Sequence, residues 1–176
     1  MSRTRARMRA AAAAWLLALA LAGAPHSAGA QSCHPLDGVW VLQPDRSLLG
    51  SGLSFNPYYA IAGVRLTIGA DGGRITQQWR FTGPHLERTT RYVFAVDGTR
   101  RDTAVAEPMD FEYAAIAAEW QNCTLLQTGY SHLFGMEVAT TNSYLVSPDG
   151  RELTIVQYGE SPISVVDRRL VFRKAE

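Results

Sequence analysis

Cysteine and histidine are scarce in this chain, which has two cysteines and four histidines among 176 residues. The cysteines do not form a C-x-x-C pair, and His34, His85 and His132 do not stand two or four positions from another histidine. Structural and catalytic zinc sites usually show such spacing. The sequence therefore predicts no metal site and no cofactor.

A complete catalytic motif is also missing. Gly129-Tyr130-Ser131-His132 begins like a nucleophile elbow, but the second glycine of that motif is absent. The motif also needs a turn from a strand into a helix, whereas the flanking residues here predict strands on both sides. The acidic residues that could do acid–base work are spread along the chain: Glu107, Asp110, Glu112 and Glu119. We therefore predict that the protein is not an enzyme, with Ser131 and His132 as the alternative candidates.

Long apolar runs are missing beyond the first thirty residues. Four arginines at positions 3–9 precede the apolar run Ala10–Ala22, and Ala28-Gly29-Ala30 follows it. This order is typical of a cleaved secretory signal peptide, and the apolar run is short for a membrane span. We predict a signal peptide over residues 1–30, a bacterial periplasmic or secreted protein, and no stable membrane span after cleavage. An uncleaved anchor is the alternative.

Charge of one sign is not in large excess. Loss of the four leader arginines changes the formal net charge from +1 to −3. A mildly acidic chain with scattered basic residues argues against a nucleic acid or an anionic membrane as partner. Residues 31–176 have the usual size of one domain, and no second domain or internal repeat is visible.

The two cysteines are Cys33 and Cys123. In the oxidising compartment that a signal peptide implies, a single disulfide between them is the natural interpretation. The disulfide would close a loop of about ninety residues, for which the chain-entropy model gives an upper figure of about 4–5 kcal/mol. A reactive or metal-binding pair is the alternative.

Most of the chain from residue 63 onward alternates between apolar and polar side chains, as half-buried strands do. Asp-Gly pairs at 71–72, 97–98 and 149–150 predict three hairpin turns, because glycine supplies the positive φ that such turns need. The stretches that predict strands are residues 39–42, 64–68, 75–81, 92–96, 101–105 (short or at an edge), 123–130, 138–146, 153–157 and 166–172.

Residues 113–119 fit either a helix or a strand. Their alanines favour a helix by propensity, but the flanking Tyr113 and Trp120 favour a strand. With the strand included, the chain predicts an all-β fold, a single antiparallel meander β-barrel of 8–10 strands. A two-sheet sandwich is the alternative, but closure into a barrel removes exposed strand edges.

Residues 45–61 interrupt the alternation with a segment rich in glycine, serine and proline. The segment is too apolar for a solvated linker, and a long apolar loop in a small domain is usually a lid or a packed cover. As a lid it would place four apolar side chains over the barrel mouth: Leu53, Phe55, Tyr58 and Tyr59.

The side chains predicted to face inward are mostly aromatic, and Trp40, Trp120 and Phe172 are among them. Two amides share these positions, and a buried amide without a partner costs about 1–3 kcal/mol. They need water, each other or a ligand's polar group. The predicted cavity residues are Gln77, Trp79, Phe81, Tyr92, Phe94, Asn142 and Tyr144. A filled barrel with internally satisfied amides is the alternative.

Gly38-Val39-Trp40, at the start of the predicted domain, resembles the first strand of lipocalin-like (calycin-type) barrels. The three Asp-Gly turns and the late arginines extend the resemblance over most of residues 31–176. The resemblance implies that Trp40 plugs the closed end of the barrel and that a late arginine covers it. Arg168, Arg169 and Arg173 stand late enough to do so.

The resemblance also implies a function. Lipocalin-like barrels bind small hydrophobic molecules without catalysis, so we expect a binding protein of the bacterial envelope with a small apolar molecule as partner. The alternative is a structural or protein-interaction module of the envelope with a filled core and an envelope protein as partner.

Overall fold

A computed structural model describes residues 35–49, 62–105, 112–133, 135–161 and 164–176. Every strand lies in one compact unit, Cys33–Glu176. The elements are β1 (Gly38–Leu42), the 3-10 turn η1 (Pro44–Arg46), β2 (Gly63–Asp71), β3 (Arg74–Gly83), β4 (Leu86–Ala95), β5 (Arg101–Asp102), β6 (Ala115–Gln121), β7 (Thr124–Leu133), β8 (Met136–Val146), β9 (Glu152–Ser161) and β10 (Ser164–Lys174).

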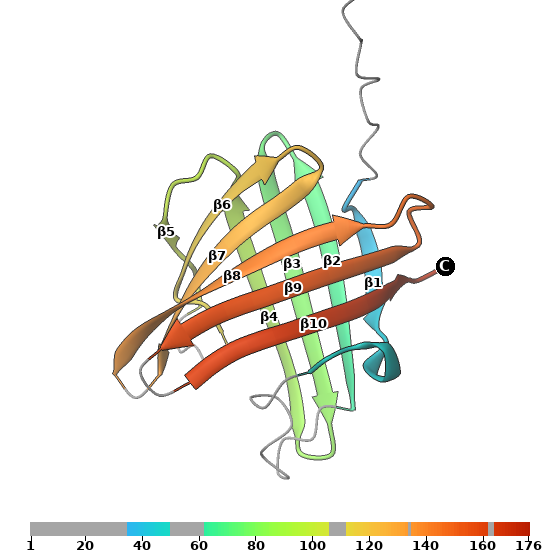
Figure 1. The fold of residues 1–176 in the computed structure, drawn as a ribbon, viewed down its shortest axis with the longest axis horizontal. Coiled ribbons are helices and arrows are strands. Elements are labelled where there is room, and N and C mark those ends of the chain that lie inside the picture. The colour runs from blue at the N-terminus through green and yellow to red at the C-terminus, as the bar shows by residue number, and fades with distance from the viewer. Residues whose placement is uncertain (1–34, 50–61, 106–111, 134, 162–163) are drawn as a thin grey trace, which may run out of the picture. The chain divides into compact units, whose positions relative to one another are not determined.

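All ten strands form one antiparallel sheet in the order β4-β3-β2-β1-β10-β9-β8-β7-β6-β5. The first and last strands of the chain, β1 and β10, are neighbours, and the sheet curls into a nearly closed barrel (Figure 1). The predicted all-β meander barrel of 8–10 strands is therefore confirmed, and the two-sheet sandwich is not what forms.

Two of the three predicted Asp-Gly hairpins are present. Gly72 and Gly73 connect β2 to β3 with φ values of 54° and 79°, the left-handed geometry of a two-residue hairpin. Gly150 has a φ of 70° between β8 and β9. The third prediction is wrong: Asp97-Gly98 turns the chain after β4, but β4 does not pair with β5.

The barrel has a seam between β4 and β6, the strand with which β5 pairs. One backbone hydrogen bond crosses it next to β4, from Gly98 N to the Ala118 carbonyl at 2.7 Å. An isolated bridge joins Asp97 to Glu119. Asp97-Gly98 therefore closes the seam at one end. The strand expected over residues 113–119 is confirmed as β6 from residue 115 onward.

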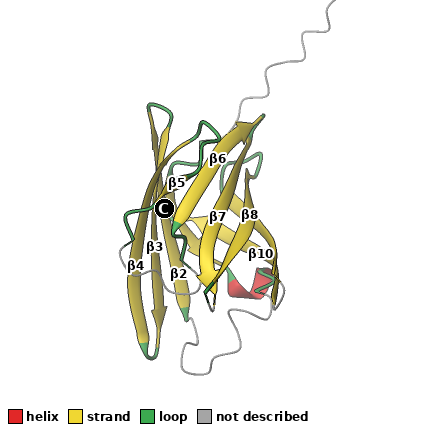
Figure 2. Ribbon diagram, turned by 90° about the vertical axis from the view of Figure 1, so that its left-hand side faces the viewer, coloured by secondary structure: helices red, strands yellow, loops and turns green. Residues whose placement is uncertain are grey.

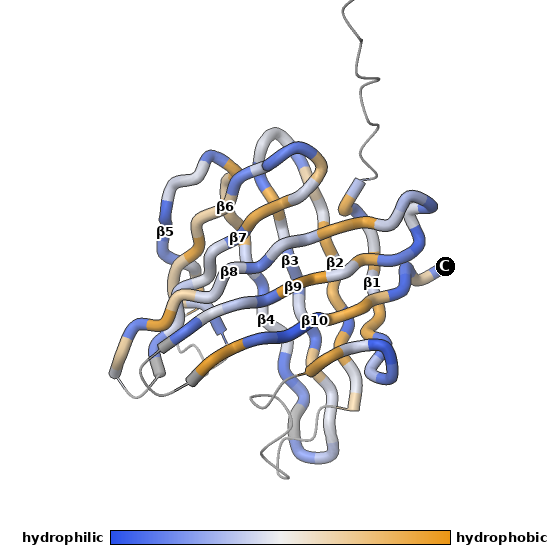
Figure 3. Tube along the Cα trace, in the orientation of Figure 1, coloured by the Kyte–Doolittle hydropathy of each residue, from blue (hydrophilic) through white to orange (hydrophobic). Residues whose placement is uncertain are grey.

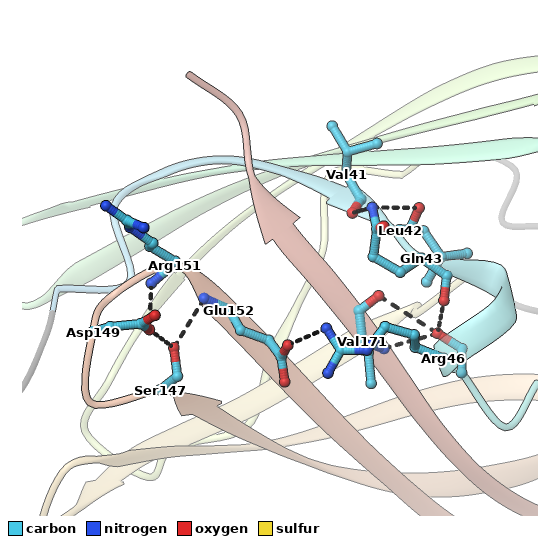
Figure 4. Close-up of polar contacts among 10 residues, drawn as sticks. Val41, Leu42, Gln43, Arg46, Ser147, Asp149, Arg151, Glu152 and Val171 are labelled. Atoms are coloured by element: carbon cyan, nitrogen blue, oxygen red, sulfur yellow. Dashed lines mark hydrogen bonds and ion pairs between the residues drawn. The ribbon is translucent and has the colours of Figure 1, made fainter.

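The pairing between β1 and β10 is interrupted by η1. Beyond Leu42 the chain bulges outward over η1 and returns to β10 at the bridge between Leu48 and Arg169. Arg46 on the bulge makes an ion pair with Glu152 on β9, with 2.5 Å between Nη1 and Oε2 (Figure 4). The Ser47 hydroxyl donates to the Gln43 carbonyl at 2.7 Å and fixes the bulge against β10 by accepting from Val171 N at 2.9 Å.

Side chains of alternate residues fill the barrel, because successive residues of a strand point to opposite faces of the sheet. The predicted inward positions on β2, β3, β4 and β8 are buried, except Phe81 and Val146, which are partly buried. Trp120 is an exception: it lies at the end of β6 and is 42% exposed. In Figure 3 the middle of β10 is hydrophilic between two hydrophobic stretches. Buried polar side chains such as Gln77 and Asn142 show that the interior is not uniformly apolar.

Trp40 is fully buried, as the resemblance implied, but the residue over it is different from the one expected. Its indole N–H donates to the Leu36 carbonyl at 2.8 Å, and Lys174 Nζ lies 5.2 Å from the ring centroid. Arg168 lies opposite Gln157, further along the barrel, and Arg169 and Arg173 are exposed on the outer face. The prediction that a late arginine covers Trp40 is therefore wrong.

Several predicted residues lie outside the described residues. They are the leader, Cys33, Leu53, Phe55, Tyr58, Tyr59, Glu107 and Asp110. The disulfide, the lid and the signal peptide therefore stay predictions. Within the described part of the chain, no helix is both long enough and apolar enough to cross a membrane.

Candidate ligand-binding site

Polar side chains cross the interior of β7, β8, β9 and β10 as a row of register partners. Gln127 is the Cα partner of Asn142, Asn142 of Gln157, and Gln157 of Arg168. The three amides are buried and Arg168 is half-buried. We call these four residues the polar belt. One such row on four neighbouring strands gives the barrel interior a polar layer.

Hydrogen bonds join part of the polar belt to Tyr113. Gln157 Nε2 donates to Asn142 Oδ1 at 2.8 Å, and Asn142 Nδ2 donates to the Tyr113 hydroxyl at 3.1 Å. The Tyr113 ring occupies the space above Gly129, where a Cβ atom would stand 2.3 Å from ring carbons. Glycine is therefore required on β7 for Tyr113 to reach the belt.

A second set of hydrogen bonds runs from the belt across the barrel to β3. Gln127 Nε2 donates to Gln77 Oε1 at 3.5 Å, and the Trp79 indole N–H donates to the same oxygen at 3.3 Å. The Tyr144 hydroxyl donates to Gln127 Oε1. Gln77 Nε2 is buried without a hydrogen bond of normal geometry to a described residue. The predicted inward amides Gln77 and Asn142 thus belong to one network.

Arg168 is the member of the belt that this network does not satisfy. Its Nε is buried and has no hydrogen-bond partner among the described residues. None of the ion pairs found within those residues involves Arg168. Burial lowers the pKa of Arg168, and nearby Tyr113 offsets part of that effect. Among the described residues, the Arg168 guanidinium therefore has no carboxylate partner.

At the seam, by contrast, an arginine is neutralised by a buried carboxylate. Arg88 on β4 donates to both carboxylate oxygens of Glu112, from Nε at 2.8 Å and from Nη2 at 2.6 Å. The Thr90 hydroxyl donates to the same carboxylate, and Glu112 is 1% exposed. Side chains therefore hold β4 to the chain before β6, at a place where the strands share no backbone ladder.

Three interior tyrosines stay neutral. Burial raises the pKa of Tyr92, Tyr113 and Tyr144 above the ordinary value for tyrosine. Tyr92 also accepts a hydrogen bond from the backbone N–H of Tyr113 at 3.1 Å across the seam. At neutral pH the Tyr92 and Tyr113 hydroxyls can therefore donate to a ligand oxygen as well as accept, whereas the Tyr144 hydroxyl already donates to Gln127.

Aromatic rings form the apolar wall next to the belt. Trp79 stacks on Phe81 with 6.0 Å between ring centroids and meets Phe172 edge-on at 6.1 Å. The predicted cavity residues Gln77, Trp79, Tyr92, Phe94, Asn142 and Tyr144 are buried and Phe81 is partly buried. The inward orientation is as predicted, whereas ligand contact by these residues stays a prediction.

Sequence reasoning missed four members of the site: Gln127, Gln157, Tyr113 and Glu112. A signal for Gln127 was present, because Leu125, Gln127 and Gly129 alternate with more exposed residues along β7. Nothing in the local pattern marked Tyr113 and Glu112, because they precede β6 and act across the seam. Arg168 was noticed but assigned to Trp40.

The alternative catalytic candidates are not brought together. Ser131 is buried and His132 is exposed, as expected for neighbours on one strand. Glu112 is bound to Arg88, and Glu119 is exposed. Within the described residues, no three histidine, cysteine or acidic side chains come together as a metal site.

Comparisons with known proteins match the chain by structure only. No protein-family model matches the sequence, and no curated protein matches it. Solved structures similar to it include a fatty acid binding protein of Schistosoma mansoni in complex with arachidonic acid, at 15% identity and a TM-score of 0.49, covering 84% of this chain and 100% of that one.

A secretory abundant heat soluble protein of Ramazzottius varieornatus is also similar, at 16% identity and a TM-score of 0.43. That match covers 80% of this chain and 95% of the other. The ten-stranded antiparallel meander of this chain, with β1 closing on β10, is the lipocalin-like architecture that its first strand predicted.

Proposed function

We propose that this chain is an exported, non-enzymatic binding protein that holds a small hydrophobic molecule with an anionic head group inside its barrel. The observation that carries the proposal is Arg168. Its guanidinium lies on the inner face of β10, with a buried Nε and no ion pair among the described residues.

Burial of the Arg168 guanidinium costs free energy. Taking a charge out of water costs several kcal/mol unless a partner of opposite charge and good geometry offsets it. The neighbours of Arg168 are neutral: Gln157 opposite it and Tyr113 nearby. A carboxylate on a bound molecule would supply the missing counter-charge and could accept two parallel N–H bonds from the guanidinium.

The surroundings of Arg168 fit such a ligand. Tyr113 has a neutral hydroxyl that could donate to the second carboxylate oxygen, and Asn142 and Gln157 already hold each other in place. Trp79 and Phe81 offer an apolar wall for the rest of the molecule. Apolar walls with a few convergent polar groups are the usual composition of a small-molecule site.

Titration with a fluorescent fatty acid tests the proposal. Arg168→Gln should weaken binding roughly 10- to 100-fold, the value of a charge-assisted hydrogen bond of about 1.5–3 kcal/mol. The matched control is Arg169→Gln, because Arg169 is the next residue on β10 and lies exposed on the outer face. Binding of the uncharged methyl ester should change little in either variant.

Two results would overturn the anionic head group. In one, the acid and its methyl ester bind Arg168→Gln with equal losses. In the other, Arg169→Gln weakens acid binding as much as Arg168→Gln. Substitutions at Trp79 and Tyr92 test the apolar wall separately, because they should weaken binding of the acid and of the ester equally.

A second candidate function is a structural or protein-interaction module of the cell envelope. The observation that favours it is the mutual hydrogen bonding of the buried amides Gln157, Asn142, Gln127 and Gln77, which a filled barrel would also need. Native mass spectrometry of the purified protein separates the two. A co-purifying apolar molecule supports the binding protein, and an empty barrel with a bound protein supports the module.

Export is part of the proposal and has its own test. An exported chain should begin at Gln31 and carry a disulfide between Cys33 and Cys123. Intact-mass measurement gives the first residue, and peptide mapping without reduction gives the pairing. A protein that retains residues 1–30, or that releases two free thiols, would contradict this part.

A further inference from the structure

The outer face of β2, β3 and β4 brings exposed arginines together. Arg65 on β2 is the Cα partner of Arg80 on β3. Arg91 on β4 is the partner of Gln78, one outward position along β3 from Arg80. All three arginines are exposed. The strand register therefore gathers charges that are scattered in the sequence.

The same row continues across β1 to β10. Val41 is the Cα partner of Arg65 on one side and of Arg173 on the other, and Arg173 is exposed. We call Arg65, Arg80, Arg91 and Arg173 the arginine face. It extends over five neighbouring strands of the sheet.

Carboxylates neutralise only part of the arginine face. Arg80 binds Glu87 at 2.6 Å, and Arg173 lies opposite Glu152, which binds Arg46. Neither Arg65 nor Arg91 takes part in an ion pair within the described residues. Like charges directly opposite each other destabilise a sheet. The pairing of Arg65 with Arg80 therefore indicates a role other than folding.

The opposite wall of the barrel has a different surface. Figure 2 shows β2, β3 and β4 on one side of the barrel and β6, β7 and β8 on the other. Every outward position is uncharged on β7 from residue 126 to 130, on β8 from 139 to 145, and on β9 from 154 to 158. Arg100 lies over Tyr130 on that wall but is paired with Glu137. The net charge of the chain therefore does not describe the arginine face.

A pocket of about 410 Å³ lies at the edge of the arginine face. Arg88, Thr89 and Arg91 line it on β4, and Val93 and Val105 give it an apolar side. Arg88 is already bound to Glu112, but the Arg91 guanidinium beside apolar side chains suits a phosphate attached to an acyl chain. The outward positions of β2, β3 and β4 carry no aromatic residue on which a nucleic acid base could stack.

We propose that the arginine face docks the barrel on an anionic lipid bilayer, with the pocket beside Arg91 receiving a phosphate-bearing head group. Charges on the opposite wall of the barrel do not weaken the attraction of the arginine face to the bilayer. Stacked sheets lie about 10 Å apart, and charges are screened over about 8 Å at physiological salt. This inference does not depend on a ligand inside the barrel. It replaces the expectation, drawn from net charge, that an anionic membrane is not a partner.

Co-sedimentation with lipid vesicles tests the inference. The probes are phosphatidylcholine vesicles with and without phosphatidylserine, at physiological salt. Each arginine near an anionic surface contributes about 1 kcal/mol, so the triple variant R65Q/R80Q/R91Q should lower the partition coefficient about a hundredfold. The matched control R100Q/R101Q/R151Q removes the same charge from exposed arginines outside the arginine face and should leave binding within a few-fold.

In the vesicle experiment all variants must begin at the same residue and have the same fold. Each is expressed from the full chain, intact mass confirms the same first residue, and circular dichroism confirms the fold. Three results would overturn the inference: no preference of the unaltered protein for the anionic vesicles, an equal loss in the control triple variant, or binding to a DNA duplex without binding to vesicles.

Discussion

The two halves of the barrel interior are built from different side chains. The half toward the β2–β3, β6–β7 and β8–β9 hairpins is mostly apolar, and its fully buried members include Trp40, Ile75, Leu125, Leu153, Ile155 and Phe172. The other half holds the polar belt and Tyr113, and Gln77 reaches the belt from its place on β3 between Ile75 and Trp79. One sheet encloses both halves, so the difference comes from the residues alone.

The contrast indicates that the two halves of the interior have different roles. Burial of apolar surface contributes about 25 cal/mol per Å², so the apolar half supplies most of the stability. The polar half is costly to bury and leaves Arg168 Nε without a partner among the described residues. Places where a protein gives up stability in this way are often functional sites. The difference between the halves therefore fits a folding role for one and the proposed binding role for the other.

The largest expected effect tests the apolar half. Phe172→Ala removes a fully buried ring that packs edge-on against Trp79, and should lower the free energy of unfolding by about 3–5 kcal/mol. Urea denaturation measures it. The control is Val156→Ala on the outer face of β9, which should cost far less. Similar losses in the two variants would mean that the apolar half does not dominate stability.

The next effect tests the seam beside the polar half. Glu112→Gln removes the charge that binds Arg88 and should cost about 2–3 kcal/mol, less than a fully buried pair, because Arg88 is partly exposed. A double-mutant cycle with Arg88→Gln measures the coupling. A coupling near zero would mean that the ion pair does not hold the seam together.

Period-two alternation made much of this interior predictable. Trp79, Gln77 and Asn142 were expected to point inward, and they do, because side-chain direction in a strand depends only on local parity. The turns at Gly72 and Gly150 were also local features, because each needs a residue that adopts positive φ.

Long-range register was not predictable in the same way. The residue above Trp40 depends on how β1 aligns with β10 after the barrel closes, and the alignment places Lys174 there. Likewise, Asp97-Gly98 predicted a turn, but nothing in the sequence predicted that β4 would not pair with β5, the next strand in the chain. Glu112 finds Arg88 only through that seam. Contacts set by closure between distant strands carry no local sequence signal.

A smaller effect concerns pH and the buried tyrosines. The pKa of Tyr92 is raised by burial, so the folded state keeps its proton at pH values where the unfolded chain loses it. Stability should therefore be constant below about pH 10 and fall above it, by up to about 1.4 kcal/mol per pH unit for this group. Denaturant midpoints for the unaltered protein and Tyr92→Phe, measured between pH 9 and 11 (roughly the range where an exposed tyrosine ionises), should diverge. Parallel curves would contradict the buried, neutral hydroxyl.

The smallest expected effect is also the one that separates the two halves most directly. Substitution of a core residue should lower the stability of the protein. Arg168→Gln should instead raise the free energy of unfolding of the ligand-free protein by about 1 kcal/mol, because it removes a buried charge that no described residue pairs. Thermal unfolding of lipid-extracted protein measures it, and Arg169→Gln should stay within about 0.5 kcal/mol as an exposed control. A clear loss of stability in Arg168→Gln would make Arg168 part of the folding core. A gain in stability together with weaker fatty acid binding would place Arg168 on the functional side of the barrel.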